Sequence, residues 1–241
     1  HCAMGEATER HAGEIGIARE PQDALAAVSH ERSSRARAAG LLADEIVPVY
    51  VPQRRGDPLL VSDDEGIRTD IDTASLGRLQ PAFDPEGNIT AGNASQISDG
   101  GAAVVVTTME RAEALGIEPL AEIVSHGQVA GPDTSLLHQP SNAIRLALDH
   151  AGLDVNDMDL FEINEAFAAV ALASMDALGV GAGIVNVNGG AIALGHPIGM
   201  SGTRIVLTLA HELKRRGGGV GAAGLCGGGG QGEALVIRVR A

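Results

Sequence analysis

The sequence is poor in aromatic residues, cysteine and lysine. Its 241 residues include three Phe, one Tyr, no Trp, two cysteines and a single lysine. The cysteines, Cys2 and Cys226, are too few for a disulfide framework. Because no secretion signal is recognised near the N-terminus, this cysteine usage indicates a reducing, cytoplasmic location. No apolar run approaches the ~18 residues that span a bilayer, and we expect no membrane partner.

Positive charge is also scarce. Seventeen Lys and Arg stand against 31 Asp and Glu, a formal net charge of −14 at pH 7. Proteins that bind nucleic acid usually carry the opposite sign, because neutralising phosphate drives their affinity. We therefore expect no nucleic-acid partner. With 44% hydrophobic and 20% charged residues, the composition is that of an ordinary globular protein long enough to bury a core.

The first 97 residues predict helices and loops that lie over another unit. Residues 5–40 have helical, Ala-rich patterns, and 45–53 has the composition of a strand. Pro48 and Pro52 restrict that strand to an edge or an irregular conformation. From residue 54 to 97 the chain is rich in turn formers.

From residue 98 onwards, predicted strands alternate with predicted helices. The β-branched run at 101–109 predicts a buried strand, and a short helix follows it. Further strands are expected at 119–130, at 184–190 and on both sides of a glycine loop in 220–240, with helices at 140–153 and 199–217 and a strand that leads into a helix over 159–179. This alternation predicts a layered α/β domain over 98–241.

The first candidate motif, at 187–204, places His196 between Gly195 and Pro197 in a loop that leads into a helix. Flanking glycines allow tight turns and the close approach of a ligand, and a histidine held there can act as a base near neutral pH. The alternatives are a glycine-rich connection with an incidental histidine, or a loop that cradles phosphate. The segment lacks the lysine of a P-loop, which argues against an NTPase.

The second motif, at 222–234, places Cys226 before four glycines. A lone cysteine is by default a buried structural residue. The glycines favour a functional role, because they open the loop and direct backbone N–H groups at a developing oxyanion. The thiol is then either a nucleophile or an acid/base. There is no CxxC pair and no ligand spacing among the histidines, so no metal site is predicted.

The third motif, at 162–172, places Asn164 and Glu165 at a junction between strand and helix, among apolar residues. Asparagine is a good helix cap, and this is the structural interpretation. The functional interpretation is an amide that holds a water or a carbonyl oxygen in a buried pocket.

Together, and in this order, NEAF at 164–167, GHP at 195–197 and CGGGGQG at 226–232 resemble the thiolase family of acyl-CoA acyltransferases. Segments 44–49 and 90–103 also resemble that family, and the resemblance extends over essentially the whole chain. It implies an α/β fold: a layered α/β/α/β/α sandwich of two similar halves, with an α/loop domain that holds coenzyme A (CoA).

By that resemblance, residues 1–97 are the later part of the CoA-binding loop domain. Residues 98–118 are the closing strand and helix of the N-terminal half, and 119–241 are a complete C-terminal half. Most of the N-terminal half is absent from the sequence. The absent part includes the glycine-rich segment that carries the family's nucleophilic cysteine, and Cys2 does not replace it.

The resemblance also implies roles at the catalytic motifs. His196 is the base that activates the nucleophilic cysteine, and Asn164 fixes a water beside it to complete one oxyanion hole. Cys226 exchanges a proton with the substrate carbon, and the Gly228 N–H belongs to a second oxyanion hole. Ser95 and Ala91 match positions that contact pantetheine. The remaining CoA and substrate positions are Met4, Phe83 and Phe167 along the tunnel, and Arg68 and Ser75 at the adenine and its phosphates.

The function implied is reversible Claisen condensation of acyl-CoAs, or thiolytic cleavage of 3-ketoacyl-CoA, by a ping-pong mechanism. CoA thioesters are then substrates, and no cofactor is expected. Assembly would be a homodimer or homotetramer through the N-terminal half, and the 241 residues alone are expected to be inactive. Two alternatives stay open. One is another condensing enzyme of this fold, such as a ketoacyl synthase, against which CGGGGQG argues. The other is a non-catalytic acyl-CoA-binding remnant, or a subunit that needs a partner chain.

Overall fold

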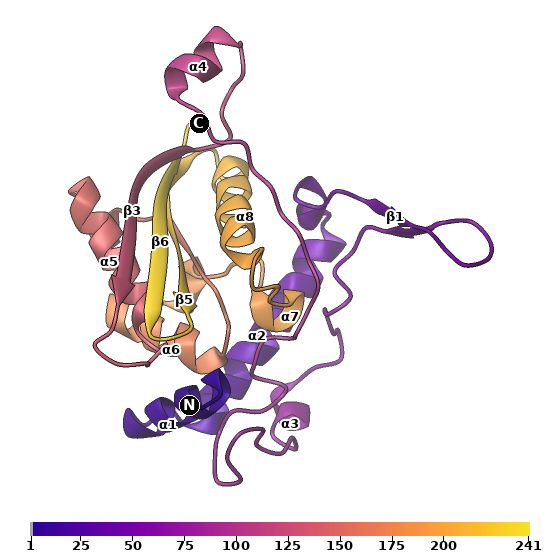
Figure 1. Ribbon diagram of the computed structural model, residues 1–241, viewed down its shortest axis with the longest axis vertical. Coiled ribbons are helices and arrows are strands. Elements are labelled where there is room, and N and C mark those ends of the chain that lie inside the picture. The colour runs from indigo at the N-terminus through magenta and orange to yellow at the C-terminus, as the bar shows by residue number, and fades with distance from the viewer. Residues whose placement is uncertain (1) are drawn as a thin grey trace.

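A mixed four-stranded sheet lies at the centre of the computed structural model, which describes residues 2–241 (Figure 1). In spatial order its strands are β3 (Glu122–Ala130), β6 (Gln231–Val239), β5 (Gly219–Gly227) and β4 (Leu160–Ile163). The β3–β6 and β6–β5 pairs are antiparallel, whereas β4 runs parallel to β5. The strands predicted at 119–130, at the start of 159–179 and within 220–240 are therefore confirmed.

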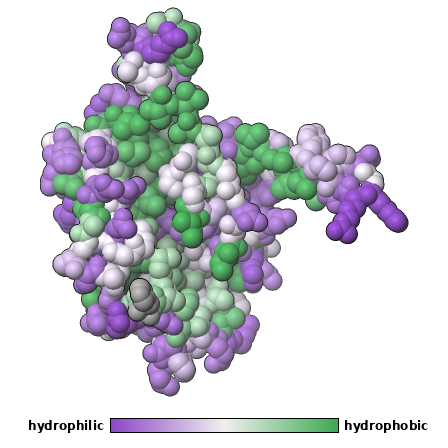
Figure 2. All heavy atoms as spheres, viewed as in Figure 1, coloured by the Kyte–Doolittle hydropathy of each residue, from purple (hydrophilic) through white to green (hydrophobic). Residues whose placement is uncertain are grey.

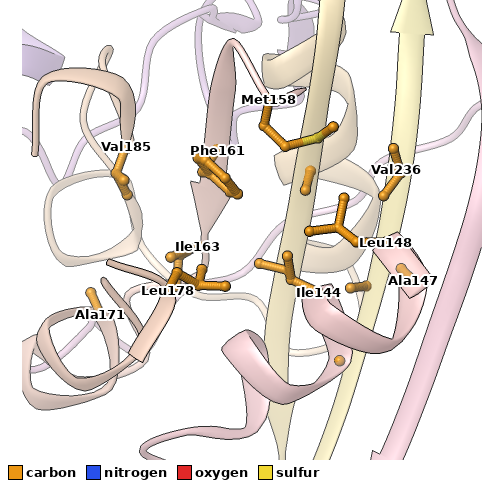
Figure 3. Close-up of a cluster of buried hydrophobic side chains, with 13 residues drawn as sticks. Ile144, Ala147, Leu148, Met158, Phe161, Ile163, Ala171, Leu178, Val185 and Val236 are labelled. Carbon is orange, nitrogen blue, oxygen red and sulfur yellow. The ribbon is translucent and has the colours of Figure 1, made fainter. Parts of the chain in front are cut away.

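Helices cover both faces of this sheet. On one face lies α5 (Gln139–Ala151) with α6 (Ala168–Leu178), and on the other lies α8 (Ser201–Arg215). The first interface is the buried cluster of Figure 3, where Ile144 and Leu148 of α5 point towards strand side chains. These elements form three layers, so the α/β fold is confirmed. Residues 2–241 hold one layered sheet and do not by themselves make the five layers expected of the whole family fold.

Alternation along β6 explains how one strand serves both cores. Ala234 and Val236 belong to the cluster beneath α5, whereas Leu235 and Ile237 pack in the cluster beneath α8. Successive side chains of a strand point to opposite faces, so an unbroken apolar run is required where both faces are covered. Helix α8 ends in basic residues, which the negative end of the helix dipole favours.

The first 97 residues form helices and loops beside this unit, as predicted. Helix α2 (Arg19–Ala38) packs on α6 and on the short helix α7 (Ala191–Leu194). A hairpin of two short strands projects as an arm, with Tyr50 68% exposed (Figure 1). Figure 2 shows hydrophobic residues gathered where this arm leaves the body. The elements of this region are α1 (Met4–Glu14), α2 (Arg19–Ala38), η1 (Leu41–Asp44), β1 (Val49–Val51), β2 (Leu59–Val61) and α3 (Thr73–Leu76).

Two predicted strands are wrong. Residues 101–107 form no strand, and Val105 is 95% exposed, because no other strand lies beside this β-branched run within residues 2–241. At 184–190 only one bridge forms, between Phe161 and Val185. There Asn186 turns the chain with φ 47°, and its side-chain amide bonds both backbone groups of Ile163 in place of a ladder. The remaining short elements are α4 (Met109–Ala114), η2 (Val155–Asp157), η3 (Ala182–Ile184) and α7 (Ala191–Leu194).

No helix within the described 240 positions, 2–241, combines the length and apolarity needed to cross a bilayer. The same part of the chain contains no group of three or more His, Cys, Asp or Glu side chains arranged to hold a metal ion.

The contact between α5 and β3 depends on a glycine. A Cβ on Gly127 would lie 2.7 Å from the Ala147 nitrogen and closer still to the Ala143 carbonyl oxygen. We expect Gly127→Ala to lower the free energy of unfolding by about 1–3 kcal/mol, because the helix must shift away from the sheet. Urea denaturation measures this. Gly183→Ala is the control, since a Cβ there meets nothing within 4 Å. Equal stabilities of the two variants would contradict the packing described.

Candidate functional site

The carboxyl ends of β4 and β5 form the edge at which two of the motifs meet. Asn164 directly follows β4, and its N–H donates to the Gly224 carbonyl of β5 at 3.0 Å. Cys226 lies two residues further along β5 and is 7% exposed. In α/β sheets, ligands bind outside the carboxyl ends of parallel strands. The parallel pairing therefore brings Asn164 and Cys226 to the edge where a ligand site is expected.

The loop between α7 and α8 presents His196 to this edge. Gly195 has φ +95°, a backbone conformation that favours glycine, and a Cβ there would lie 2.8 Å from the Ser98 Cβ. The backbone N–H of His196 donates to the backbone carbonyl of Gln96 at 3.1 Å. Its ring Nε2 lies 3.4 Å from the Asn164 Nδ2. The structure thus joins His196 and Asn164, which are 32 positions apart, as sequence analysis predicted.

A serine sets the tautomer of this imidazole. The Ser201 hydroxyl donates to the Pro197 carbonyl at 3.0 Å, and its oxygen lies 2.6 Å from the His196 Nδ1. Since the hydroxyl proton is already donated, the serine oxygen accepts from Nδ1–H. The lone pair then resides on Nε2. Burial, and after it the positive charge of Arg204, lowers the pKa of His196, so the ring is a neutral base at physiological pH.

Asn164 is fully buried, and its role as a helix cap is ruled out. Helix α6 is capped at Phe167, three residues later, without a side-chain hydrogen bond. The Asn164 Nδ2 faces His196, and its Oδ1 has no hydrogen-bond partner among residues 2–241. A buried amide with free hydrogen-bonding capacity beside a base is suited to hold a small polar group, as the functional interpretation of this motif requires.

The Cys226 thiol sits at the start of a glycine turn. Burial raises the pKa of Cys226 to about 12, so the thiol keeps its proton at neutral pH. Gly229 and Gly230 have positive φ, which permits the tight connection from β5 to β6. Gly228 is exposed at the beginning of this turn. A protonated, desolvated thiol fits an acid/base better than a standing thiolate nucleophile.

Four of the residues assigned to the CoA tunnel lie together beside this turn. The Met4 sulfur lies 3.3 Å from where a Gly228 Cβ would stand. The rings of Phe83 and Phe167 meet edge to face, with centroids 6.1 Å apart. The Ser95 N–H donates at 3.0 Å to the carbonyl of the residue before Phe167. Phe167 and Cys226 share one buried cluster, so this group adjoins Cys226.

Three other assigned residues stand apart. The Ser75 hydroxyl donates to the Asp72 carbonyl at 2.7 Å, and its oxygen accepts from the Asp72 backbone N–H at 3.1 Å, which completes a capping box at α3. Arg68 and Ala91 are exposed. Within residues 2–241, no hydrogen bond or ion pair links Arg68, Ser75 or Ala91 to His196 or Asn164. Their contact with the adenine end or pantetheine stays a prediction.

Sequence reasoning gave Glu165 no role beyond the helix junction. Its carboxylate is 2% exposed and accepts from the Ser29 hydroxyl at 2.7 Å, the Ile192 N–H at 3.1 Å and the Asn186 amide at 2.9 Å. These donors belong to α2, α7 and the loop before α7. A carboxylate among apolar residues in NEAF was the signal that could have revealed this role, because a buried charge requires several donors. Ser201 and Gln96 were likewise missed.

Family models described as "Thiolase, N-terminal domain" and "Thiolase, C-terminal domain" match residues 1–110 and 117–239. A probable acetyl-CoA acetyltransferase of Mycobacterium tuberculosis is 57% identical, over 98% of this chain and 60% of that relative. The acetyl-CoA acetyltransferase of Cupriavidus necator is 49% identical, over 97% of this chain and 60% of the relative.

Solved structures agree. The crystal structure of the Bacillus anthracis acetyl-CoA acetyltransferase superposes with a TM-score of 0.96 at 43% identity, over 99% of this chain and 60% of that one. The crystal structure of human mitochondrial 3-ketoacyl-CoA thiolase superposes with a TM-score of 0.93 at 41% identity, over 98% of this chain and 60% of that one. The chain therefore spans about 60% of the length of these relatives.

Removing the Glu165 carboxylate leaves three buried donors without an acceptor. We expect Glu165→Ala to lower the free energy of unfolding by about 3 kcal/mol, because each buried donor then loses its partner. Glu165→Gln, which keeps one acceptor oxygen, should cost less. Chemical denaturation compares the two variants with the unaltered chain. A loss for Glu165→Ala below about 0.5 kcal/mol, the range of ordinary surface substitutions, would contradict the network.

The two cysteines should differ in reactivity. Cys2 is exposed, whereas the buried Cys226 has its pKa raised to about 12. We expect iodoacetamide at pH 8 to label Cys2 rapidly and Cys226 far more slowly, because only the thiolate reacts. The Cys226 rate should keep rising with pH for as long as the protein stays folded. Peptide mass spectrometry over time measures both sites, and equal rates would contradict a desolvated Cys226.

Proposed function

The chain belongs to the thiolase family, and from this membership we propose that it is part of an acyl-CoA acyltransferase. The reaction is the reversible condensation of two acyl-CoA molecules, or the cleavage of a 3-ketoacyl-CoA by CoA. One observation carries the proposal: the neutral Nε2 of His196 faces the buried Asn164 amide at the same sheet edge as the Cys226 thiol. Thiolase family models also favour this chemistry over that of a ketoacyl synthase.

The chemistry needs the groups gathered at this edge. A carbon next to a thioester is a weak acid, so its enolate forms only where a base and oxyanion donors act together. His196 supplies a base with an available lone pair, fixed by Ser201. Asn164 supplies an amide beside it, and the turn after Cys226 supplies backbone N–H groups.

In the proposed cycle, His196 accepts the proton of the family's nucleophilic cysteine, whose sulfur attacks the first acyl-CoA and releases CoA. Cys226 gives its proton to the departing CoA sulfur, and the thiolate so formed then takes a proton from the methyl carbon of a second acetyl-CoA. The resulting enolate attacks the carbonyl carbon of the acyl-enzyme and frees the nucleophilic cysteine, which regains its proton from His196. Oxyanions are held by a water on Asn164 with His196, and by the Gly228 N–H. The thiolate of a cysteine with a raised pKa is a stronger base than an ordinary thiolate. It therefore takes a proton from a weak carbon acid more readily, because the pKa values of the thiol and of the carbon acid are closer.

The nucleophilic cysteine is not among these 241 residues. Cys2 is exposed and lies just before α1, and we do not assign it the role of the nucleophile. We propose that turnover requires the remaining portion of a thiolase, joined in the same chain or supplied by another subunit, with acyl-CoA and CoA as small-molecule partners. Homodimer or homotetramer formation through the N-terminal half belongs to the same proposal.

A kinetic comparison tests the proposed function. In the complete enzyme, we expect His196→Ala to reduce kcat for CoA-dependent cleavage of acetoacetyl-CoA at least about 100-fold, because the base is lost. His211→Ala, on the outer part of α8, is the matched control and should retain turnover. The 241 residues alone should show none. If His196→Ala kept most of its turnover, His196 would not be the base.

A further inference from the structure

The short helix α7 ends where the chain turns away to present His196. In a continued α-helix, the His196 backbone N–H would bond the carbonyl four residues earlier, that of Ile192. It does not, because Gly195 leaves helical geometry with φ +95°. Within residues 2–241, no backbone N–H donates to the Ile192 or Ala193 carbonyl, although both residues are buried. The polar groups at this helix end therefore need partners from outside the helix.

Both halves of the missing helical bond end on one residue, Gln96. Its backbone carbonyl accepts from the His196 N–H at 3.1 Å. Its side-chain Nε2 donates to the Ile192 and Gly66 carbonyls at 3.0 Å each and to the Ala193 carbonyl at 3.2 Å. Gln96 thus replaces both the acceptor and the donor that the helix loses, which allows the chain to leave α7 directly before the imidazole.

The segment that carries this glutamine, 96–100, lies against the loop after α7. A Cβ on Gly195 would lie 2.8 Å from the Ser98 Cβ, and a Cβ on Gly100 would lie 2.6 Å from the Pro197 Cγ. Such distances leave no room for a side chain at either glycine. The two backbones are therefore in direct contact along the loop that holds the base.

The start of the same segment is fixed to the NEAF motif. Ala94 forms an isolated β-bridge with Phe167. The next N–H along the chain donates at 3.0 Å to the carbonyl of the residue before Phe167. Gln96 follows directly, so one short segment holds NEAF with its backbone and the end of α7 with its glutamine. This segment therefore joins His196 to the motif that contains the buried amide.

We propose that Gln96 is a positioning residue for the base: its amide holds the end of α7 and its carbonyl holds the His196 N–H, so that Nε2 faces Asn164. This role rests on the proposed function, which makes His196 the base, and it falls to a residue outside the three motifs. Glutamine suits it because its amide carries two N–H donors. Methionine has nearly the same length and carries none.

Kinetics of the complete enzyme test this role. We expect Gln96→Met to lower kcat for acetoacetyl-CoA cleavage about 10- to 100-fold, because a small misplacement of a reacting group costs that much. The KM for CoA should stay the same. Gln53→Met, on the exposed hairpin arm, also removes an amide that donates to a backbone carbonyl, and should keep kcat. An unchanged kcat in Gln96→Met would overturn the proposal.

A measurement without substrate separates positioning from general weakening. In the unaltered chain, the bond to Ser201 selects one tautomer, so the two ring 15N signals of His196 lie far apart. In Gln96→Met these signals should move together as the tautomers exchange, while the backbone amides of β6 exchange with water as slowly as before. Unmoved ring signals, or amide exchange that quickens equally in β6, would overturn the proposal.

A second variant disturbs the same amide without removing it. A Cβ on Gly66 would lie 2.7 Å from both the Gln96 Nε2 and the Ala193 carbonyl oxygen, so Gly66→Ala displaces the amide by one methyl group. The ring signals of His196 should move in the same direction as in Gln96→Met, and unmoved signals would overturn the proposal. Moved ring signals in a complete enzyme that lacks thiolase activity would reject the proposed function and leave the positioning of His196 standing.

Discussion

The Glu165 carboxylate is the point on which the site depends. It lies just beyond β4 and accepts hydrogen bonds from α2, from the loop after η3 and from the first turn of α7. The backbone is drawn so closely around it that a Cβ on Gly190 would strike the carboxylate. Since α7 leads directly to His196, the position of the imidazole follows from the position of this one buried acid. A charge taken out of water is stable only with such a set of donors.

Around Glu165, each of the three motifs contributes one functional group to the site. The parallel pairing of β4 with β5 brings Asn164 and Cys226 to one edge, and the loop after α7 adds His196 across from them. Ser201 fixes which ring nitrogen carries the proton. The loop region supplies the aromatic and sulfur side chains beside Cys226. The outcome is a neutral base, a buried amide and a protonated thiol at one sheet edge, which are groups that the proposed enolate chemistry at a thioester uses.

Much of this arrangement could be predicted from local pattern, because periodicity and glycine turns are local properties. The helix at 140–153 and the strands around Cys226 follow from spacing alone. The strand predicted at 101–109 does not form, because a β-branched segment becomes a strand only beside another strand. At 184–190 the Asn186 side chain takes the place of ladder bonds, which no periodicity reveals. Ser29 and Glu165 are 136 positions apart, so their bond depends on tertiary structure. Motif resemblance named the candidate catalytic residues but not the residues that position them.

The central claim is that the sheet edge holding Asn164, His196 and Cys226 is one acyl-CoA site. A crystal structure of the complete enzyme with a non-cleavable acetyl-CoA analogue tests it most directly. The account predicts the carbonyl oxygen of the analogue within hydrogen-bonding distance of His196 Nε2 or of a water on Asn164, and its methyl carbon against the Cys226 sulfur. An analogue bound away from this edge, with His196 and Cys226 untouched, would contradict it.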